Sequence, residues 1–377
     1  MRVGVDLRCL TEPAGSGVAT YTRAVLSALA ESPYAQSVAW QGFTTGWPMS
    51  SALNLPLAMP VKQWPWPNRL TNMMVAFLSW PSATRLVGAV DCVWQPNPLF
   101  FPASSIPQVV TIHDLSFLHY PQFFALRTRL WYLRWVRYWL EHPPRLAHLV
   151  CVSQATAEDV IERYPHWRSR MTIVAPPPPA DQPLRSDPES FNRLGIAGPY
   201  VLCVGTLELR KNIEGVAAGF SQFARRHPAY ELVFVGQWGR GERFLRRVLA
   251  HASNVSRIHV LGYVSTMQRE ALYQRAFAVV YPSFYEGYGY PPLEAMAYGV
   301  PVVVSSVTSL PEVLDQAALY IDPDHVAYEL PAVLTALVED PTLYREYQAR
   351  SRVHLEKLRH CFSINPLLEV WQRYALA

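Results

Sequence analysis

Short apolar runs alternate with longer stretches of helical periodicity throughout the second half of the chain. The runs are rich in Val, Ile, Leu and Tyr, and most of them end in Gly, Ser or Asp. They span residues 200–205, 231–236, 258–263, 277–283, 301–306 and 318–322. Near-continuous apolar strands that alternate with helices are typical of a parallel sheet covered on both faces. This half is therefore predicted to be a doubly wound α/β domain.

The first half shows the same alternation with a less regular rhythm. Residues 153–164 predict a helix that begins at a cap formed by Ser153 or Thr156. The apolar runs that predict strands here are residues 2–7, 92–96, 108–114 and 148–153. Two α/β domains of similar design are therefore expected. Ligands of such sheets bind beyond the carboxyl ends of the strands, so the residues that follow each strand are the candidates for chemistry.

A proline-rich segment at 175–183 separates the two halves. Its four consecutive prolines fit neither a helix nor a central strand, and they predict a semi-rigid linker. The expected organisation is an N-terminal Rossmann-like domain at 1–180, a C-terminal Rossmann-like domain at 181–360 and a last helix within 361–377.

Composition and charge exclude several classes of protein. Half of the residues are hydrophobic and 16% are charged, which is typical of a globular chain and not of a disordered one. The excess of 33 basic over 29 acidic residues is too small to indicate a nucleic-acid binder. The five cysteines lack metal-ligand spacing. With neither a signal peptide pattern nor an apolar run of membrane-spanning length, a cytoplasmic enzyme is expected.

The segment 285–303 holds two carboxylates eight residues apart. Glu286 follows a predicted strand, and Glu294 stands in the first turn of a predicted helix. Gly287 and Gly289 between them allow the backbone to approach a ligand closely. A purely structural alternative is that Glu294 complements the helix dipole and that Glu286 is solvated.

A second candidate site follows the run at 200–205. Arg210, Lys211 and Asn212 stand at the start of the next predicted helix, where backbone donors and two positive side chains converge. Arg and Lys together suit a diphosphate, whose charge must be neutralised when a bond to it breaks. The sequence has only three lysines, which strengthens this interpretation over that of two solvated cations.

Two weaker candidates lie in the first half. Gly15 and Gly17 fit a turn that approaches phosphates, but Thr20 stands where a third glycine would be expected, so an ordinary turn is equally consistent. His113 directly follows a predicted strand, where a histidine can hydrogen-bond a substrate oxygen or carry a proton. A structural histidine is the alternative.

Tryptophan is concentrated in the first half, with nine of twelve before residue 140. A helical projection of residues 127–140 places Trp131, Trp135 and Trp139 on one face and arginines on the other. With the apolar run 73–78, this basic amphipathic helix would suit a bilayer interface. The alternative is that the tryptophans fill the core.

Taken together, these motifs resemble those of the family-4 retaining glycosyltransferases, which have two Rossmann-like domains facing across a cleft, the GT-B architecture. The resemblance rests on segments 15–17, 112–114, 152–153, 205–212, 261–264 and 285–303. The sequences of 111–117 and 205–212 are most similar to those of bacterial mannosyl- and rhamnosyltransferases of O-antigen or exopolysaccharide synthesis.

The resemblance implies a role for each candidate residue. Arg210 and Lys211 would hold the donor diphosphate, Glu294 the ribose, and His113 the donor sugar. Glu286 would hold the sugar hydroxyls together with the backbone of Gly287, Tyr288, Gly289 and Tyr290, although Tyr288 and Tyr290 replace the Phe and Leu that are common there. Tyr263 and Val264 would lie by the base, and Gly15 and Gly17 by the phosphates. The last helix would pack back on the N-terminal domain through Trp371 and Tyr374.

The expected activity is retaining transfer of mannose, or a relative such as D-rhamnose, from a GDP-sugar to a growing lipid-linked glycan, with no metal or other cofactor. The partners would be the nucleotide sugar, a lipid-linked oligosaccharide acceptor and the inner face of the cytoplasmic membrane, without nucleic acid. A UDP-sugar donor, a sugar-nucleotide epimerase or hydrolase of the same architecture, and a non-catalytic sugar-binding protein are the alternatives.

Overall fold

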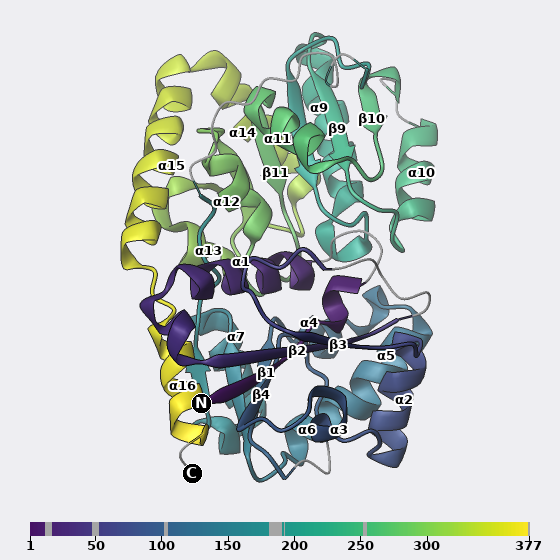
Figure 1. Ribbon diagram of the computed structural model, residues 1–377. Helices are drawn as coiled ribbons and strands as arrows, with labels where there is room; N and C mark the ends of the chain where they lie inside the picture. Colours follow the sequence, from purple (N-terminus) through teal and green to yellow (C-terminus); the bar gives the residue numbers. More distant parts are fainter. Residues whose placement is uncertain are drawn as a thin grey trace. The chain divides into compact units, whose positions relative to one another are not determined.

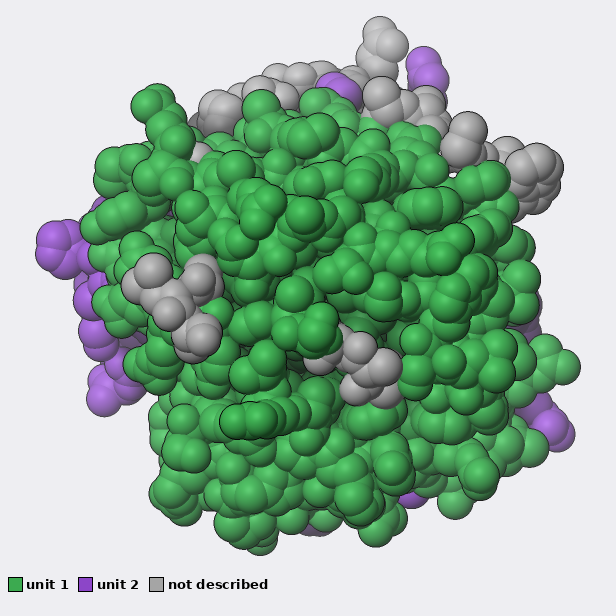
Figure 2. All heavy atoms as spheres, turned by 60° about the horizontal axis from the view of Figure 1, so that its bottom comes forward, with its two compact units in different colours: residues 1–119, 126–177, 362–377 green, residues 120–125, 178–361 purple. Residues whose placement is uncertain are grey.

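The chain forms two compact units, which Figure 2 colours separately. The computed structural model describes residues 1–11, 17–46, 53–101, 105–180, 191, 193–251 and 255–375 (Figure 1). Unit 1 comprises Met1–His119, Leu126–Pro177 and Phe362–Ala377, and unit 2 comprises Tyr120–Ala125 and Pro178–Cys361. Gly15 and residues 181–183 of the proline-rich segment lie outside the described residues.

Unit 2 is built on a parallel sheet of six strands, in the order β10-β9-β8-β11-β12-β13. Its strands are β8 Tyr200–Val204, β9 Glu231–Val235, β10 Ile258–Val260, β11 Ala278–Tyr281, β12 Val302–Ser305 and β13 Leu319–Ile321. Every neighbouring pair is parallel. Each of the six apolar runs of the second half forms one of these strands, so this prediction is confirmed.

The strands of unit 2 bury both of their faces. Leu202 and Val279 belong to one buried cluster, whereas Val201, Cys203 and Val280 belong to another. Because successive side chains of a strand point to opposite faces of the sheet, the two clusters lie on opposite sides of it. Helices must therefore cover both faces, as the apolar runs predict.

Seven helices are described in unit 2. They are α9 Ile213–Arg226, α10 Glu242–His251, α11 Thr266–Arg275, α12 Tyr290–Met296, α13 Leu310–Leu314, α14 Val326–Glu339 and α15 Pro341–Cys361. Helices α9 and α14 pack closely, since a Cβ at Gly219 would lie 3.0 Å from the carbonyl oxygen of Val326. A small residue at this position allows the two helices to approach one another.

Unit 1 contains a parallel sheet of seven strands, in the order β3-β2-β1-β4-β5-β6-β7. The strands are β1 Arg2–Asp6, β2 Ala39–Thr45, β3 Val61–Trp64, β4 Cys92–Gln95, β5 Gln108–Ile112, β6 Ala147–Cys151 and β7 Met171–Ile173. The sequence pattern predicts β1, β4, β5 and β6 and misses the other three. The two-domain α/β class with parallel sheets is confirmed.

Eight helices are described in unit 1. They are α1 Gly17–Glu31, α2 Asn68–Leu78, α3 Ala83–Val87, α4 Ser116–His119, α5 Leu126–Trp131, α6 Arg137–Glu141, α7 Gln154–Arg163 and α16 Asn365–Ala375. The predicted helix at 153–164 is α7, and its cap is Ser153, whose hydroxyl accepts a hydrogen bond from the Thr156 amide. Among the helices that the structure describes, none is both long and apolar enough to cross a bilayer.

The helical segment 126–141 is not a regular α-helix. A π-helical stretch, Tyr132–Val136, joins α5 to α6. Val136 and Leu140 are buried, while Trp131, Trp135 and Trp139 are half-buried. The tryptophans of this segment therefore neither fill the core nor stand fully in solvent.

Both sheets reverse their strand order at one place. In unit 1 the order reverses between β1 and β4, and in unit 2 between β8 and β11. Such a reversal sends the two following connections to opposite faces, which leaves a crevice at the carboxyl ends of the two strands. The loops after these four strands are therefore the places where each unit can bind a ligand.

Helix α16 packs on β4 and β7 of unit 1. Trp371 is fully buried, with its ring centroid 5.3 Å from that of Trp40 and 5.8 Å from that of Trp94. The Tyr374 hydroxyl shares a hydrogen bond of 3.2 Å with Nδ1 of His148. Helix α16 thus contributes buried side chains to the unit 1 core.

Replacing Trp371 by alanine should destabilise unit 1 by about 3–5 kcal/mol, because the change removes a large buried ring and leaves a cavity. Hydrogen exchange of the unit 1 strands under increasing denaturant measures this loss. Glu369→Ala, at an exposed position of the same helix, is the matched control and should change the free energy of unfolding little. Equal losses in the two variants would contradict the anchoring role of Trp371.

Candidate functional site

The loop after β8 presents two cations at the start of a helix. Gly205 ends the strand with φ 140°, a conformation that favours glycine. A 3₁₀ turn, Leu209–Lys211, then leads to Asn212, whose side chain accepts a hydrogen bond from the Gly215 amide and caps α9. Arg210 and Lys211 therefore stand directly before the N-terminus of α9, as predicted.

The loop after β11 carries Glu286 in a fixed backbone conformation. The Glu286 amide donates to the Thr308 hydroxyl at 3.0 Å, and the Ser309 hydroxyl donates to the Glu286 carbonyl at 3.0 Å. Gly289 has φ 94°, and a Cβ there would lie 2.5 Å from Cδ2 of Leu310. The loop thus needs glycine at this position for both conformation and space.

The two loops meet, and three of the residues predicted to act on the donor come into contact. Nζ of Lys211 lies 2.5 Å from Oε1 of Glu286, and Nη1 of Arg210 lies 3.1 Å from the same oxygen. Lys211 also donates to the Tyr281 hydroxyl. One carboxylate therefore orients both cations at the strand-order reversal of unit 2.

The charges of this cluster are strongly coupled because the groups are buried. Burial by itself would raise the pKa of Glu286, but Arg210 and Lys211 outweigh it and lower the pKa to about 2. Burial lowers the pKa of Lys211, and Glu286 opposes that shift. Glu286 is consequently ionised at neutral pH and holds the two cations near each other.

Arg210 makes two further contacts that fix its guanidinium. Its Nη1 donates to the Tyr285 carbonyl at 2.7 Å, and its Nη2 donates to Glu208 at 2.9 Å. Sequence reasoning missed Glu208 and Tyr281. Tyr281 stands at the carboxyl end of a predicted strand, which was a usable signal, whereas Glu208 had none beyond its closeness to Arg210.

Glu294 lies in a separate polar group on the same unit. Its Oε2 accepts a hydrogen bond of 2.8 Å from the Tyr273 hydroxyl, and Nη2 of Arg269 lies 3.4 Å from its Oε1. Burial raises the pKa of Glu294, an effect that Arg269 and Tyr273 oppose. Neither partner was predicted, because both lie on α11, far from Glu294 in sequence.

The remaining predicted residues of unit 2 have mixed environments. Tyr263 is 64% exposed, whereas Val264 packs against the apolar cluster of the sheet. The rings of Tyr288 and Tyr290 lie 6.5 Å apart, and both side chains are half-buried. Gly287 is buried beside Glu286.

Residues Tyr120–Ala125 belong to unit 2 and lie against the loop that carries Glu286. The ring centroid of Tyr120 is 6.2 Å from that of Phe284 and 6.3 Å from that of Tyr285. Arg240 donates to the Phe124 carbonyl. This aromatic group supports the backbone immediately before Glu286.

His113 follows β5 in unit 1, and its ring is fixed in one tautomer. Its Nε2 lies 2.7 Å from the Pro96 carbonyl oxygen, which can only accept, so Nε2 carries the proton. Burial lowers the pKa of His113, which favours the neutral ring. Nδ1 is then an acceptor, which suits a hydroxyl donor and not a phosphate oxygen.

The glycine loop is described only in part. Gly17 is the first residue of α1, and a Cβ added there would meet no described atom within 4 Å. Gly15 lies outside the described residues. The role of both glycines at the phosphates stays a prediction.

Two family models match successive parts of the chain. The model "Glycosyltransferase Family 4" matches residues 15–181, and the model "Glycosyl transferases group 1" matches residues 187–354. The second match covers all the predicted donor residues of unit 2, and the first covers His113.

Relatives and a solved structure agree with these matches. The chain is 31% identical over 256 residues to O-antigen chain mannosyltransferase B of Escherichia coli, covering 66% of each chain. It is 28% identical over 218 residues to O-antigen chain mannosyltransferase RfbU of Salmonella typhimurium, covering 58% of this chain and 57% of that protein. The matches thus span about two thirds or less of these relatives. Sucrose-phosphate synthase from Thermosynechococcus elongatus has the same fold, with a TM-score of 0.75 at 19% identity, covering 100% of this chain and 98% of that one.

Replacing Glu286 by glutamine should lower the free energy of unfolding of unit 2 by about 3–5 kcal/mol at pH 7, because two buried cations lose their shared anion. The folded pKa of about 2 lies below the usual 4.5, so the ionised carboxylate stabilises the fold above about pH 4.5. This contribution is lost as the pH falls toward 2. The difference between wild type and variant should therefore shrink over that range in denaturant titrations.

Glu346→Gln is the matched control for this experiment. Glu346 forms an exposed ion pair with Arg350 on α15, and such pairs contribute about 0.2–1 kcal/mol. Two results would contradict this prediction: a loss of unfolding free energy in Glu286→Gln no larger than in the control, or a loss that does not vary with pH. Either would show that the charges of the cluster are solvated and do not interact strongly.

Proposed function

The chain belongs to the glycosyltransferases of family 4 and group 1, and from this premise we propose that it transfers mannose, or a relative such as D-rhamnose, from a GDP-sugar to a growing lipid-linked glycan. The product would be O-antigen or exopolysaccharide. The observation that carries the proposal is the contact of Arg210 and Lys211 with one buried carboxylate, Glu286, at the strand-order reversal of unit 2. The O-antigen mannosyltransferases among the relatives support mannose as the sugar.

The donor diphosphate would bind at the start of α9. Arg210 and Lys211 supply positive charge there, and their side chains are 15% and 11% exposed, so water screens them little. When the bond to the sugar breaks, negative charge grows on the departing phosphate oxygen. Cations already held in place by Glu286 stabilise that charge without reorganisation.

The donor sugar and the ribose would be held by acceptors. Glu286 has a second carboxylate oxygen, which suits sugar hydroxyls. In unit 1, the neutral ring of His113 presents Nδ1 as an acceptor, which also suits a hydroxyl. Glu294 is a buried carboxylate that suits the ribose hydroxyls of the nucleotide. Tyr263 and Val264 would flank the base.

The reaction would keep the configuration at the sugar carbon. The bond between C1 and the diphosphate oxygen breaks, and the acceptor hydroxyl oxygen bonds to C1 on the face that the diphosphate leaves. The hydroxyl proton passes to the departing diphosphate. The cations that neutralise this leaving group are Arg210 and Lys211, so we propose that catalysis requires no metal.

The acceptor's lipid places the reaction at a membrane, and we propose that α2 and the segment 126–141 rest on its inner, anionic face. The ring of Phe77 on α2 lies 4.4 Å from that of Trp135, so the two elements are adjacent. Their exposed apolar side chains are Leu70, Met73, Phe77, Leu78, Leu126, Leu130 and Tyr138. Exposed arginines at 69, 127, 129, 134 and 137 accompany them. Apolar and basic groups on one surface suit a bilayer with anionic headgroups.

Calorimetry should show metal-free binding of GDP that Lys211→Met abolishes, because the variant removes a buried charge from the diphosphate site. Lys357→Met is the matched control, since Lys357 is exposed and lies 3.6 Å from Asp315. Magnesium should not restore binding to Lys211→Met.

The same titrations decide between the donors. Selective binding of GDP and GDP-mannose supports the proposed donor, whereas preference for UDP and UDP-glucose would replace the sugar nucleotide and keep the reaction class. Consumption of the sugar nucleotide at full rate without any acceptor would instead support a hydrolase or epimerase.

Sedimentation with vesicles containing phosphatidylglycerol tests the membrane surface. The double variant Leu78→Ser with Leu130→Ser should weaken binding by about tenfold, since it removes two apolar side chains from the bilayer contact. The control pairs Tyr328→Ser with Val353→Ser, at exposed apolar positions of unit 2. Equal loss in both double variants, or equal binding to neutral phosphatidylcholine vesicles, would contradict this surface.

A further inference from the structure

We propose that a hollow at the strand-order reversal of unit 1 binds one sugar residue of the acceptor glycan, through Arg8 and Asn72 at its floor and the indoles of Trp131, Trp135 and Trp139 at its wall. The inference rests on the proposed function, because it takes the acceptor to be a glycan.

The hollow consists of two adjoining cavities that share Arg8, Asn72 and Leu99. Both cavities open to solvent, so a ligand can reach their lining residues from outside. The first cavity is lined mainly by apolar side chains and the second mainly by polar ones, among them Asp6, Asn68 and Asn97.

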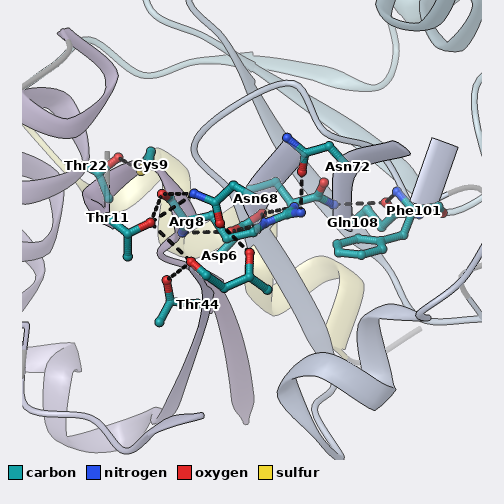
Figure 3. Close-up of polar contacts among 12 residues, drawn as sticks. Asp6, Arg8, Cys9, Thr11, Thr22, Thr44, Asn68, Asn72, Phe101 and Gln108 are labelled. Carbon is teal, nitrogen blue, oxygen red and sulfur yellow. Dashed lines mark hydrogen bonds and ion pairs between the residues drawn. The ribbon is translucent and has the colours of Figure 1, made fainter. Parts of the chain in front are cut away.

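A buried ion pair forms the floor (Figure 3). Asp6 and Arg8 are 4% and 3% exposed, and Nη2 of Arg8 lies 2.6 Å from Oδ2 of Asp6. Nη1 of Arg8 donates to Oδ1 of Asn72 at 2.7 Å. Asn68 supports the same loop by donating to the Thr11 hydroxyl at 3.0 Å. The floor is rigid and carries no net charge.

Several donors at the floor have no partner within the described parts of the chain. A guanidinium has five N–H groups, and Arg8 uses three of them on Asp6 and Asn72. The Asn72 amide nitrogen and the Asn97 side chain likewise bond to no described residue. These groups line the hollow, so they can hydrogen-bond a ligand that enters it.

The wall is built from three indoles spaced four residues apart. In an α-helix, residues four apart overshoot a full turn of 3.6 residues and drift around the axis. The π-helical turns of Tyr132–Val136 are wider and oppose this drift, so Trp131, Trp135 and Trp139 all line one cavity. Such π-helical turns occur frequently at functional sites.

A polar floor beside an aromatic wall matches the chemistry of a sugar ring. A hexose carries hydroxyl groups along its edge and C–H groups on its faces, so it can hydrogen-bond Arg8 and Asn72 while a face stacks on an indole. A phosphate fits less well, since Asp6 already neutralises Arg8 and would repel an anion. A lipid chain would leave the buried donors unpaired, which is costly.

The position of the hollow agrees with this assignment. Asp6 is the last residue of β1, Arg8 follows that strand, and Asn97 follows β4; the order of the sheet reverses between these two strands. Ligands of doubly wound sheets bind at this place. Helix α2 and the segment 126–141, which form the other walls, also carry the proposed membrane surface, so a lipid-linked glycan would meet the hollow close to its lipid.

The test uses the whole chain and a soluble α-linked trimannoside without lipid. The indole N–H signals of Trp131, Trp135 and Trp139, assigned from single substitutions, are followed by NMR during titration. We expect the trimannoside to shift these signals, and Asn72→Ala and Trp139→Ala to weaken its binding by about tenfold or more. Trp80→Ala, which changes a half-exposed tryptophan of the same unit outside the hollow, should bind as the wild type does.

Two results would overturn the assignment. The first is that trimannoside at saturating concentration leaves all three indole signals unmoved. The second is that inorganic pyrophosphate shifts them and displaces the sugar, which would make the hollow an anion site. GDP titration of Asn72→Ala separates this inference from the proposed function. If Asn72→Ala binds GDP with wild-type affinity but has lost trimannoside binding, the result supports the hollow as a sugar site. If the wild-type protein binds no nucleotide, the donor proposal is refuted, and the trimannoside titration still tests the hollow independently.

Discussion

Burial of both faces of a parallel sheet is the constraint on which the rest of this protein depends. In unit 2, alternate residues of every central strand enter apolar clusters on opposite sides, so packed apolar side chains cover both faces of the sheet. The backbone bonds along the ladder are also satisfied within the sheet. Chemistry is therefore confined to the carboxyl edge, where strands give way to loops. The strand-order reversal then selects two loops of that edge in each unit, and the best-defined polar groups of both units lie there.

The side chains at the two strand-order reversals differ in their balance of charge. At β8 and β11, Arg210 and Lys211 converge on one carboxylate, so an incoming dianion finds two cations whose positions are already fixed. At β1 and β4, one cation faces one carboxylate in a closed pair, and the nearby amides and indoles are neutral. The first arrangement favours a phosphorylated ligand, and the second favours a neutral one with many hydroxyls. A transferase that moves a sugar from a nucleotide to a glycan needs one site of each kind.

Strands buried on both faces could be predicted from the sequence, because their apolar runs are nearly continuous. Strand β3 could not, since it is a polar edge strand with two exposed residues, and neither could β7, since none of its three residues is buried. In unit 2, the contact of Lys211 with Glu286 follows from their positions after neighbouring strands. The partners of Glu294 and the hollow beside Arg8 were missed for one physical reason. Asn72 is 64 residues from Arg8, and only the packing of α2 brings the two together. A projection with 3.6 residues per turn places the three tryptophans on one face, but it cannot show that this face lines a cavity together with Arg8.

A contribution to the stability of the fold does not by itself explain the two buried ion pairs. Removing a carboxylate and a cation from water costs several kcal/mol, and well-packed apolar residues of the same volume often stabilise a core as well or better. Asp6 and Arg8 are nevertheless almost completely buried, and Lys211 and Glu286 nearly so. Each pair lies at the carboxyl edge of a sheet and not within a core cluster. A ligand that binds at this edge can offset the free energy cost of desolvating the pair. Side chains that are already desolvated and held by their partners lose little more freedom when a ligand binds, so the free energy spent in folding is recovered as preorganisation.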